Sequence, residues 1–175
     1  MALHWIVALL ILGAYVAVYY HEWFTQRNTP AYVTSIKLHF TFGISIGAFV
    51  ILRVIWRLTH RAPALPPGPA WEHLAARAAH GLLYLFMIGM PLTGYFGTKG
   101  GGGYFGLPAF PDTALYSWLV TDTLGLTWDA WRKPLGTFHF ISGENIVWVL
   151  ILIHTLAALY HQFLKRDALM RRMWL

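Results

Sequence analysis

Four long apolar stretches, separated by polar or proline-rich segments, follow one another along the chain. A helix needs about 20 predominantly apolar residues to cross the hydrocarbon core of a bilayer. The stretches reach this length and predict spanning helices at residues 2–24, 36–58, 75–97 and 135–164. We therefore expect an all-α integral membrane four-helix bundle in which residues 1–175 form a single transmembrane domain.

The first apolar stretch is interpreted as a span rather than as a cleaved signal peptide. It lacks the basic segment that precedes the apolar region of a signal peptide, and it lacks a small-residue cleavage site.

Four spans place both termini on the same side of the membrane. The three connections are a polar turn, a proline-rich stretch at residues 62–70, and a longer segment at residues 98–134 whose glycine run, residues 100–103, predicts a flexible loop.

Lys and Arg are distributed unevenly between the two predicted faces of the membrane. Short loops rich in these residues stay in the cytoplasm. The face with both termini carries eight basic and two acidic residues, whereas the opposite face carries five basic and four acidic residues. We therefore expect both termini in the cytoplasm. The eight basic residues are Arg53, Arg57, Arg61, Arg77, Lys165, Arg166, Arg171 and Arg172.

The composition supports the membrane class and restricts the chemistry. The chain is 57% hydrophobic and 11% charged, with a formal net charge of +6, which is too apolar for a soluble domain of this size. It contains no Cys, which excludes disulfides, iron–sulfur clusters, thiolate ligation of haem and covalent haem attachment. Lipid is the expected environment, and we expect no nucleic-acid partner.

Four histidines lie within or at the edges of the apolar stretches: His4, His39, His139 and His154. An imidazole is costly inside a membrane but is a good ligand of haem iron. His139 and His154 are 15 positions apart on one predicted helix, which separates them by about 22 Å along the helix and about 60° around it. Both therefore face one bundle interior at two depths. From the up-and-down course of the chain we pair His39 with His139 on the external side, and His4 with His154 on the cytoplasmic side.

Small residues follow the predicted ligands at helical spacing. His39 is followed by Gly43 and Gly47, and small residues allow a flat macrocycle to approach a helix backbone closely. Glycine at every fourth position is also a helix-packing device, and a single intramembrane histidine is often only hydrogen-bonded. A haem-free structural membrane protein is therefore one alternative to two bis-histidine haems.

Further residues are candidates for contacts with haem propionates or with a quinone. Arg53 is 14 positions after His39 and about 21 Å deeper, where it can pair with propionates or snorkel to the interface. His161 and His80 lie towards the cytoplasmic side, as propionate or quinone contacts or as ordinary interfacial histidines. Glu144, inside the fourth predicted span, is a candidate proton carrier or a hydrogen-bonded carboxyl.

Several motifs are ordered along the chain. They are Leu3-His-Trp5, the stretches at residues 38–46 and 52–57, Met90-Pro-Leu-Thr-Gly94, and His154-Thr-Leu-Ala-Ala-Leu-Tyr-His161 followed by Asp167 and Met170-Arg-Arg-Met173. In these motifs, which extend over nearly the whole chain, the sequence resembles the bacterial cytochrome b561 family of four-helix di-haem membrane proteins.

The resemblance implies two b-type haems in a multi-pass protein of the bacterial inner (cytoplasmic) membrane. It also implies an oxidoreductase that oxidises superoxide to oxygen at the external (periplasmic) face and passes electrons through both haems to ubiquinone. The alternative is an electron-transfer cytochrome b subunit that exchanges electrons between quinone and a partner oxidoreductase such as a hydrogenase. Both interpretations involve the same haems, but only the electron-transfer subunit requires a partner protein.

Superoxide is an anion, so positive charge at the external face would steer it towards the haem edge. Lys99, Arg132 and Lys133 are the residues that we predict for this role. Four acidic residues share that face, so the net field there is nearly neutral.

Overall fold

The described part of the chain consists of helices and their connections. The computed structural model describes residues 2–60 and 68–167, and four of its helices are long and apolar enough to cross a membrane. The predicted all-α membrane fold is therefore confirmed. The long helices are α1 (Ala2–Phe24), α2 (Pro30–Thr59), α3 (Ala70–Gly97) and a fourth made of α5 (Trp128–Ile141), the π-helical turn η4 (Ser142–Ile146), α6 (Val147–Leu159) and the π-helical turn η5 (Tyr160–Lys165).

Three of the four helices begin earlier than the apolar pattern predicts. α2 begins at Pro30 rather than at residue 36, because the hydroxyl of Thr29 accepts a hydrogen bond from the Tyr32 amide (3.3 Å) and proline suits the first helical position. α5 is capped in the same way by Thr127 and begins at residue 128 rather than 135. α3 begins at residue 70 rather than 75. The apolar pattern marks the centre of each helix and misses its polar first turns.

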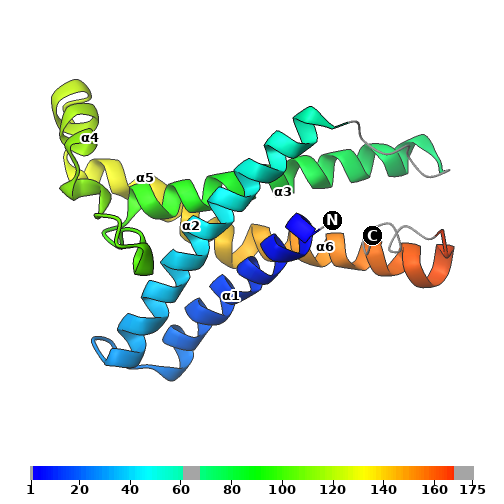
Figure 1. Cartoon of the computed structure of the whole chain (residues 1–175), viewed down its shortest axis with the longest axis horizontal. Helices are drawn as coiled ribbons and strands as arrows, with labels where there is room; N and C mark the ends of the chain where they lie inside the picture. The colour runs from blue at the N-terminus through cyan, green and yellow to red at the C-terminus, as the bar shows by residue number, and fades with distance from the viewer. Residues whose placement is uncertain (1, 61–67, 168–175) are drawn as a thin grey trace.

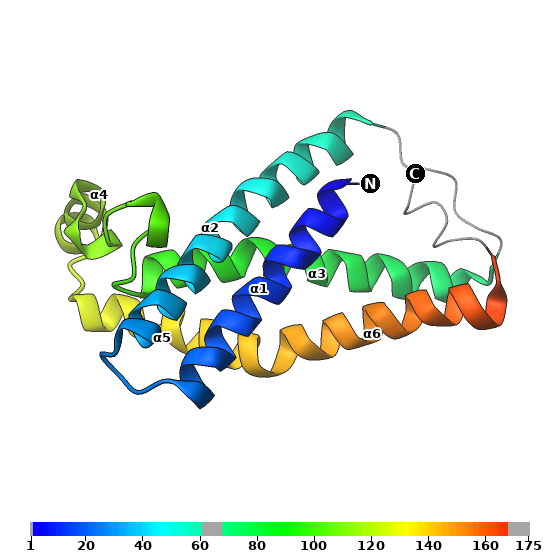
Figure 2. The same ribbon diagram turned by 60° about the horizontal axis from the view of Figure 1, so that its bottom comes forward.

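The helices pack as two pairs that cross each other. α1 and α2 lie side by side as an antiparallel pair, and α3 lies beside the fourth helix (Figure 1 and Figure 2). Buried side chains of Val7, Ala14, Ile46 and Val50 form the core between α1 and α2. Many large apolar side chains on the four helices are exposed, as expected of helices whose outer surfaces face lipid.

The connection between α3 and α5 is folded against the bundle. The backbone N–H of Tyr104 donates to Oγ1 of Thr41 on α2 (2.8 Å). At Gly103, where φ is +62°, a Cβ atom would collide with the Lys37 carbonyl oxygen. The glycine run predicted as a flexible loop is therefore a turn packed on α2, and glycine is the residue that tolerates this conformation and approach. The connection contains η1 (Gly103–Phe105), η2 (Phe110–Asp112), α4 (Ala114–Tyr116) and the π-helical turn η3 (Ser117–Thr123).

Some predicted features lie outside the described residues. They are residues 62–67 of the proline-rich stretch and the C-terminal motif Met170–Met173. Arg61, Arg171 and Arg172, which contribute to the charge asymmetry between the two faces, also lie outside. The orientation of the termini therefore stays a prediction from the sequence.

Candidate haem-binding sites

The structure brings the four candidate histidine ligands together in the two predicted pairs. The ring centres of His39 on α2 and His139 on α5 are 6.1 Å apart, and those of His4 on α1 and His154 on α6 are 6.0 Å apart. A ligating imidazole nitrogen lies about 2.0 Å from its metal and about 1.1 Å from its ring centre, so two trans imidazoles place their centres about 6 Å apart. Both pairs have the spacing that ligation of one iron by two histidines needs.

Both imidazoles of the His39–His139 pair are held by backbone carbonyls of neighbouring helices. Nδ1 of His39 lies 3.1 Å from the carbonyl oxygen of Ala14, and Nδ1 of His139 lies 3.0 Å from that of Met90. A carbonyl only accepts hydrogen bonds, so Nδ1 carries the proton in both rings and Nε2 keeps its lone pair. Metal-ligating histidines are oriented in this way in proteins. The pair is therefore arranged to present Nε2 to an iron.

An apolar cavity of about 360 Å³ lies beside the His39–His139 pair, and both imidazoles line it. Gly43 also lines it, and apart from its chain neighbours and the nearby backbone of α2, no group of the described chain lies within 4 Å of the point that a Cβ atom on Gly43 would occupy. At Gly94 on α3, a Cβ atom would lie 3.0 Å from Cε1 of His139, so glycine leaves room for the imidazole. The cavity and the open face at Gly43 fit a flat macrocycle ligated by the two histidines.

Gly47, which the sequence groups with Gly43, has a different environment. A Cβ atom on Gly47 would lie 3.5 Å from Cβ of Pro91 on α3, and Gly47 is not among the residues that line the cavity. The structure therefore places Gly43 at the cavity and Gly47 at the contact between α2 and α3.

A third imidazole lies beside the His4–His154 pair. The ring centre of His80 on α3 is 5.6 Å from that of His154. Nδ1 of His4 is buried and has no hydrogen-bond partner within the described residues. This site therefore contains three imidazoles, and within residues 2–60 and 68–167 no carbonyl contact holds them as it holds His39 and His139.

Arg53 lies close to this second site. Its guanidinium lies within electrostatic range of His4, His80 and His154, and it stacks over the ring of Tyr84 at 5.4 Å. A haem carries two anionic propionates, and a guanidinium is well suited to bind carboxylates. The position of Arg53 fits its predicted role as a propionate partner.

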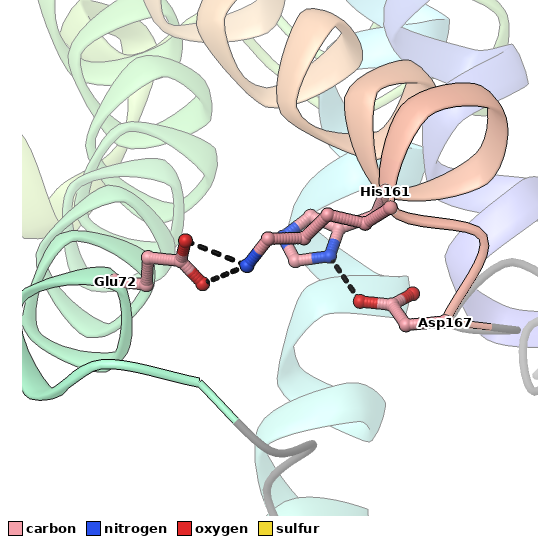
Figure 3. Close-up of polar contacts among 4 residues, drawn as sticks. Glu72, His161 and Asp167 are labelled. Carbon is pink, nitrogen blue, oxygen red and sulfur yellow. Dashed lines mark hydrogen bonds and ion pairs between the residues drawn. The ribbon is translucent and has the colours of Figure 1, made fainter.

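His161 takes part in a polar cluster at the end of the fourth helix. Its Nδ1 lies 2.5 Å from Oδ2 of Asp167, and Nζ of Lys165 lies 2.6 Å from Oε1 of Glu72 in the first turn of α3 (Figure 3). The side chains of these four residues are all mostly buried. The cluster therefore joins the start of α3 to the end of the fourth helix, and it brings a hydrogen-bonded imidazole–carboxyl pair to this end of the bundle.

The three predicted superoxide-steering cations are exposed and do not line the cavity. Nε of Arg132 donates to Oδ1 of Asp129 (2.6 Å), so a carboxylate offsets its charge. Lys99 directly follows Thr98, which does line the cavity. The ionisable lining residues besides the two predicted ligands include His21, Glu22 and Glu144. The structure thus places Lys99 next to a cavity-lining residue, and neither Arg132 nor Lys133 is among the lining residues.

Tyr15 and Tyr19 line the cavity, although neither is among the site residues predicted from the sequence. The hydroxyl of Tyr15 donates to the carbonyl oxygen of Gly143 in η4 (2.8 Å), and Nε1 of Trp148 donates to the hydroxyl of Tyr19 (2.8 Å). These contacts join α1 to the fourth helix beside the candidate haem site. The signal in the sequence is two hydroxyl-bearing residues four positions apart in an apolar span, which places them on one helix face.

Several known proteins are similar to this chain over nearly its whole length. The family profile described as prokaryotic cytochrome b561 matches residues 1–175. Cytochrome b561 homolog 2 of Escherichia coli K12 is 27% identical over 180 residues, covering 98% of this chain and 87% of the relative. Cytochrome b561 homolog 1 of the same organism is 27% identical over 178 residues, with 98% and 92% covered. The probable superoxide oxidase CybB of Yersinia pestis is 26% identical over 175 residues, with 98% and 90% covered.

Proposed function

Because this chain belongs to the prokaryotic cytochrome b561 family, we propose that it binds two haem b groups, one between His39 and His139 and one between His4 and His154. Family membership makes the chain a membrane electron-transfer protein with haem b. The observation that carries the proposed positions is the spacing of the two imidazole pairs, 6.1 and 6.0 Å between ring centres. The cavity beside the first pair supports the same assignment.

When bound, the two haems would supply one-electron transfer between the two ends of the bundle. The chain's own residues hold and surround these groups. The carbonyl oxygens of Ala14 and Met90 fix the tautomer and orientation of His39 and His139. Arg53 compensates the propionates near the second pair. The apolar helices keep water away from both sites.

We further propose that the substrate at the His39–His139 end is superoxide and that the electron acceptor at the opposite end is ubiquinone. Each superoxide anion loses one electron and leaves as neutral oxygen, and two such electrons with two protons convert ubiquinone to ubiquinol. Lys99, next to the cavity-lining Thr98, attracts the anion. At the other end, the pair of His161 and Asp167 holds a proton in a hydrogen bond. The similarity to the probable superoxide oxidase CybB of Yersinia pestis supports this choice of substrate.

The test uses the purified chain in detergent or liposomes with no other protein. We expect two haem b per chain by pyridine haemochrome, a low-spin bis-imidazole spectrum, and reduction of a soluble ubiquinone when superoxide is generated. Catalase and superoxide dismutase serve as controls, since only superoxide dismutase should stop quinone reduction.

Two other results would contradict parts of this proposal. A protein that binds haem but stays inert towards superoxide until a partner oxidoreductase is added would be an electron-transfer subunit. A purified chain that binds no haem would overturn the assignment of both histidine pairs.

A further inference from the structure

Three histidines from three different helices converge at the second candidate haem site. His154 on α6 lies 6.0 Å from His4 on α1 and 5.6 Å from His80 on α3, measured between ring centres. Both distances are close to the value of about 6 Å that two trans imidazoles on one metal require. His154 therefore has two possible partners, and one iron has room for only one of them opposite His154.

The hydrogen bonding of these rings does not select one partner. In the His39–His139 site, a backbone carbonyl holds each ring in place. Among the described residues, no side-chain hydrogen bond to His4, His80 or His154 occurs, and Nδ1 of His4 is buried without a partner. Metal-ligating histidines usually owe their fixed orientation to such a second contact. Within the described chain, no hydrogen bond of this kind fixes the orientation of the three rings.

The surroundings of His80 leave room for it to move. His80 is exposed, whereas His4 and His154 are half-buried. The next residue is Gly81, and apart from its chain neighbours and the nearby backbone of α3, no group of the described chain lies within 4 Å of the point that its Cβ would occupy. Arg53 lies within electrostatic range of all three imidazoles, so its position does not favour His4 over His80 as the partner of His154.

We propose that His80 is an alternative axial ligand of the haem at this site and exchanges with His4 opposite His154. This inference rests on the proposed haem between His4 and His154. The first haem site would then have a fixed pair of ligands, His39 and His139. The second would have one fixed ligand, His154, and two ligands that exchange, His4 and His80. The exchange needs no oxidant or reductant, because one imidazole nitrogen leaves the iron as the other binds.

The test compares four variants of the full-length chain: His4→Ala, His4→Ala with His80→Ala, His4→Ala with His73→Ala, and His154→Ala. His73 is the matched control because it lies seven positions before His80 on α3, on nearly the same face. The readouts are haem content per chain and the low-spin signals in electron paramagnetic resonance. The haem at His39 and His139 reports folding within every sample.

We expect His4→Ala to keep two low-spin haems, with a shifted resonance for the second, because His80 takes the free position. The His73 control should behave in the same way, whereas the variant that lacks both His4 and His80 should lose the second low-spin signal. His4→Phe, which keeps a ring of similar size, replaces His4→Ala if the alanine variant does not assemble.

Loss of the second low-spin signal in His4→Ala would overturn the inference, and so would its survival when both His4 and His80 are absent. His154→Ala separates this outcome from failure of the proposed function. If His154→Ala loses one haem, the proposed site stands whatever happens at His80; if it keeps both, the proposed site is itself wrong.

Discussion

The two candidate haem sites share one ligand spacing and differ in almost everything around it. At the first site, backbone carbonyls hold both imidazoles, and a cavity with an open glycine face adjoins them. At the second site, three imidazoles lie near an arginine, and Nδ1 of His4 has no hydrogen-bond partner within the described chain. The positions of the helices are enough to set the distance between two ligands, whereas the contacts behind each ring decide whether its orientation is fixed.

The largest expected effect is the loss of one haem, but not the other, when a single predicted ligand is removed. His139→Ala should remove the first haem and spare the second, and His154→Ala should do the reverse, because each substitution deletes an axial ligand of one iron only. Haem per chain should fall by about half in each variant, measured by pyridine haemochrome, and the lost resonance should differ between them. If either variant lost both haems while still folded, the division into two independent sites would be wrong.

The two histidine pairs, His39 with His139 and His4 with His154, could be predicted from the sequence. Alternation of apolar stretches and turns predicts four antiparallel spans, and the 15-residue separation of His139 and His154 predicts two depths on one helix face. These inferences depend only on helical geometry and chain direction. The ends of the helices could not be predicted as well, because the caps at Thr29 and Thr127 lie outside the apolar pattern.

The contacts behind the rings could not be predicted in the same way. The groups that hold His39 and His139 are carbonyl oxygens of Ala14 and Met90, and every residue has a backbone carbonyl, so no residue type marks them. The closeness of His80 to His154 depends on the angle and register at which α3 packs beside the fourth helix. Crossing angles arise from side-chain packing between helices, which a single sequence does not display.

The second prediction tests the cavity at the first site. Gly43→Leu should place a side chain in the open space where we propose the macrocycle, at a cost of about 1–3 kcal/mol, which corresponds to binding weakened by roughly 10- to 100-fold. Titration of the haem-free protein with haemin, followed by absorbance, measures this change.

Gly81→Leu is the matched control for that titration, since Gly81 has equally open surroundings and is not among the residues lining this cavity. It should leave the first haem in place. Equal loss of the first haem in both variants would show that leucine harms the bundle generally rather than filling the cavity.

The third prediction concerns the charge at the second site. Arg53→Gln should lower the reduction potential of the second haem, because removal of a positive charge favours the more positive ferric state. For charges about 10 Å apart, the effect is about 1–2 kcal/mol, or roughly 40–90 mV for one electron, and a spectroscopic redox titration resolves it. The first haem should keep its potential, and so should both haems in Arg77→Gln, an exposed arginine on α3. A shift of equal size at both haems would contradict the placement of Arg53 at one of them.

The smallest expected effect concerns the approach of superoxide to the first site. Lys99→Gln should lower the rate of superoxide-driven ubiquinone reduction by about two- to threefold at low ionic strength, and the difference should shrink as salt screens the charge. Arg132→Gln should change the rate less, because Asp129 already offsets the guanidinium. Haem content and both potentials should stay the same in these variants, which separates steering from damage to either site. If the two variants slowed the reaction equally, the net charge of that face, rather than a cation beside the cavity, would set the rate.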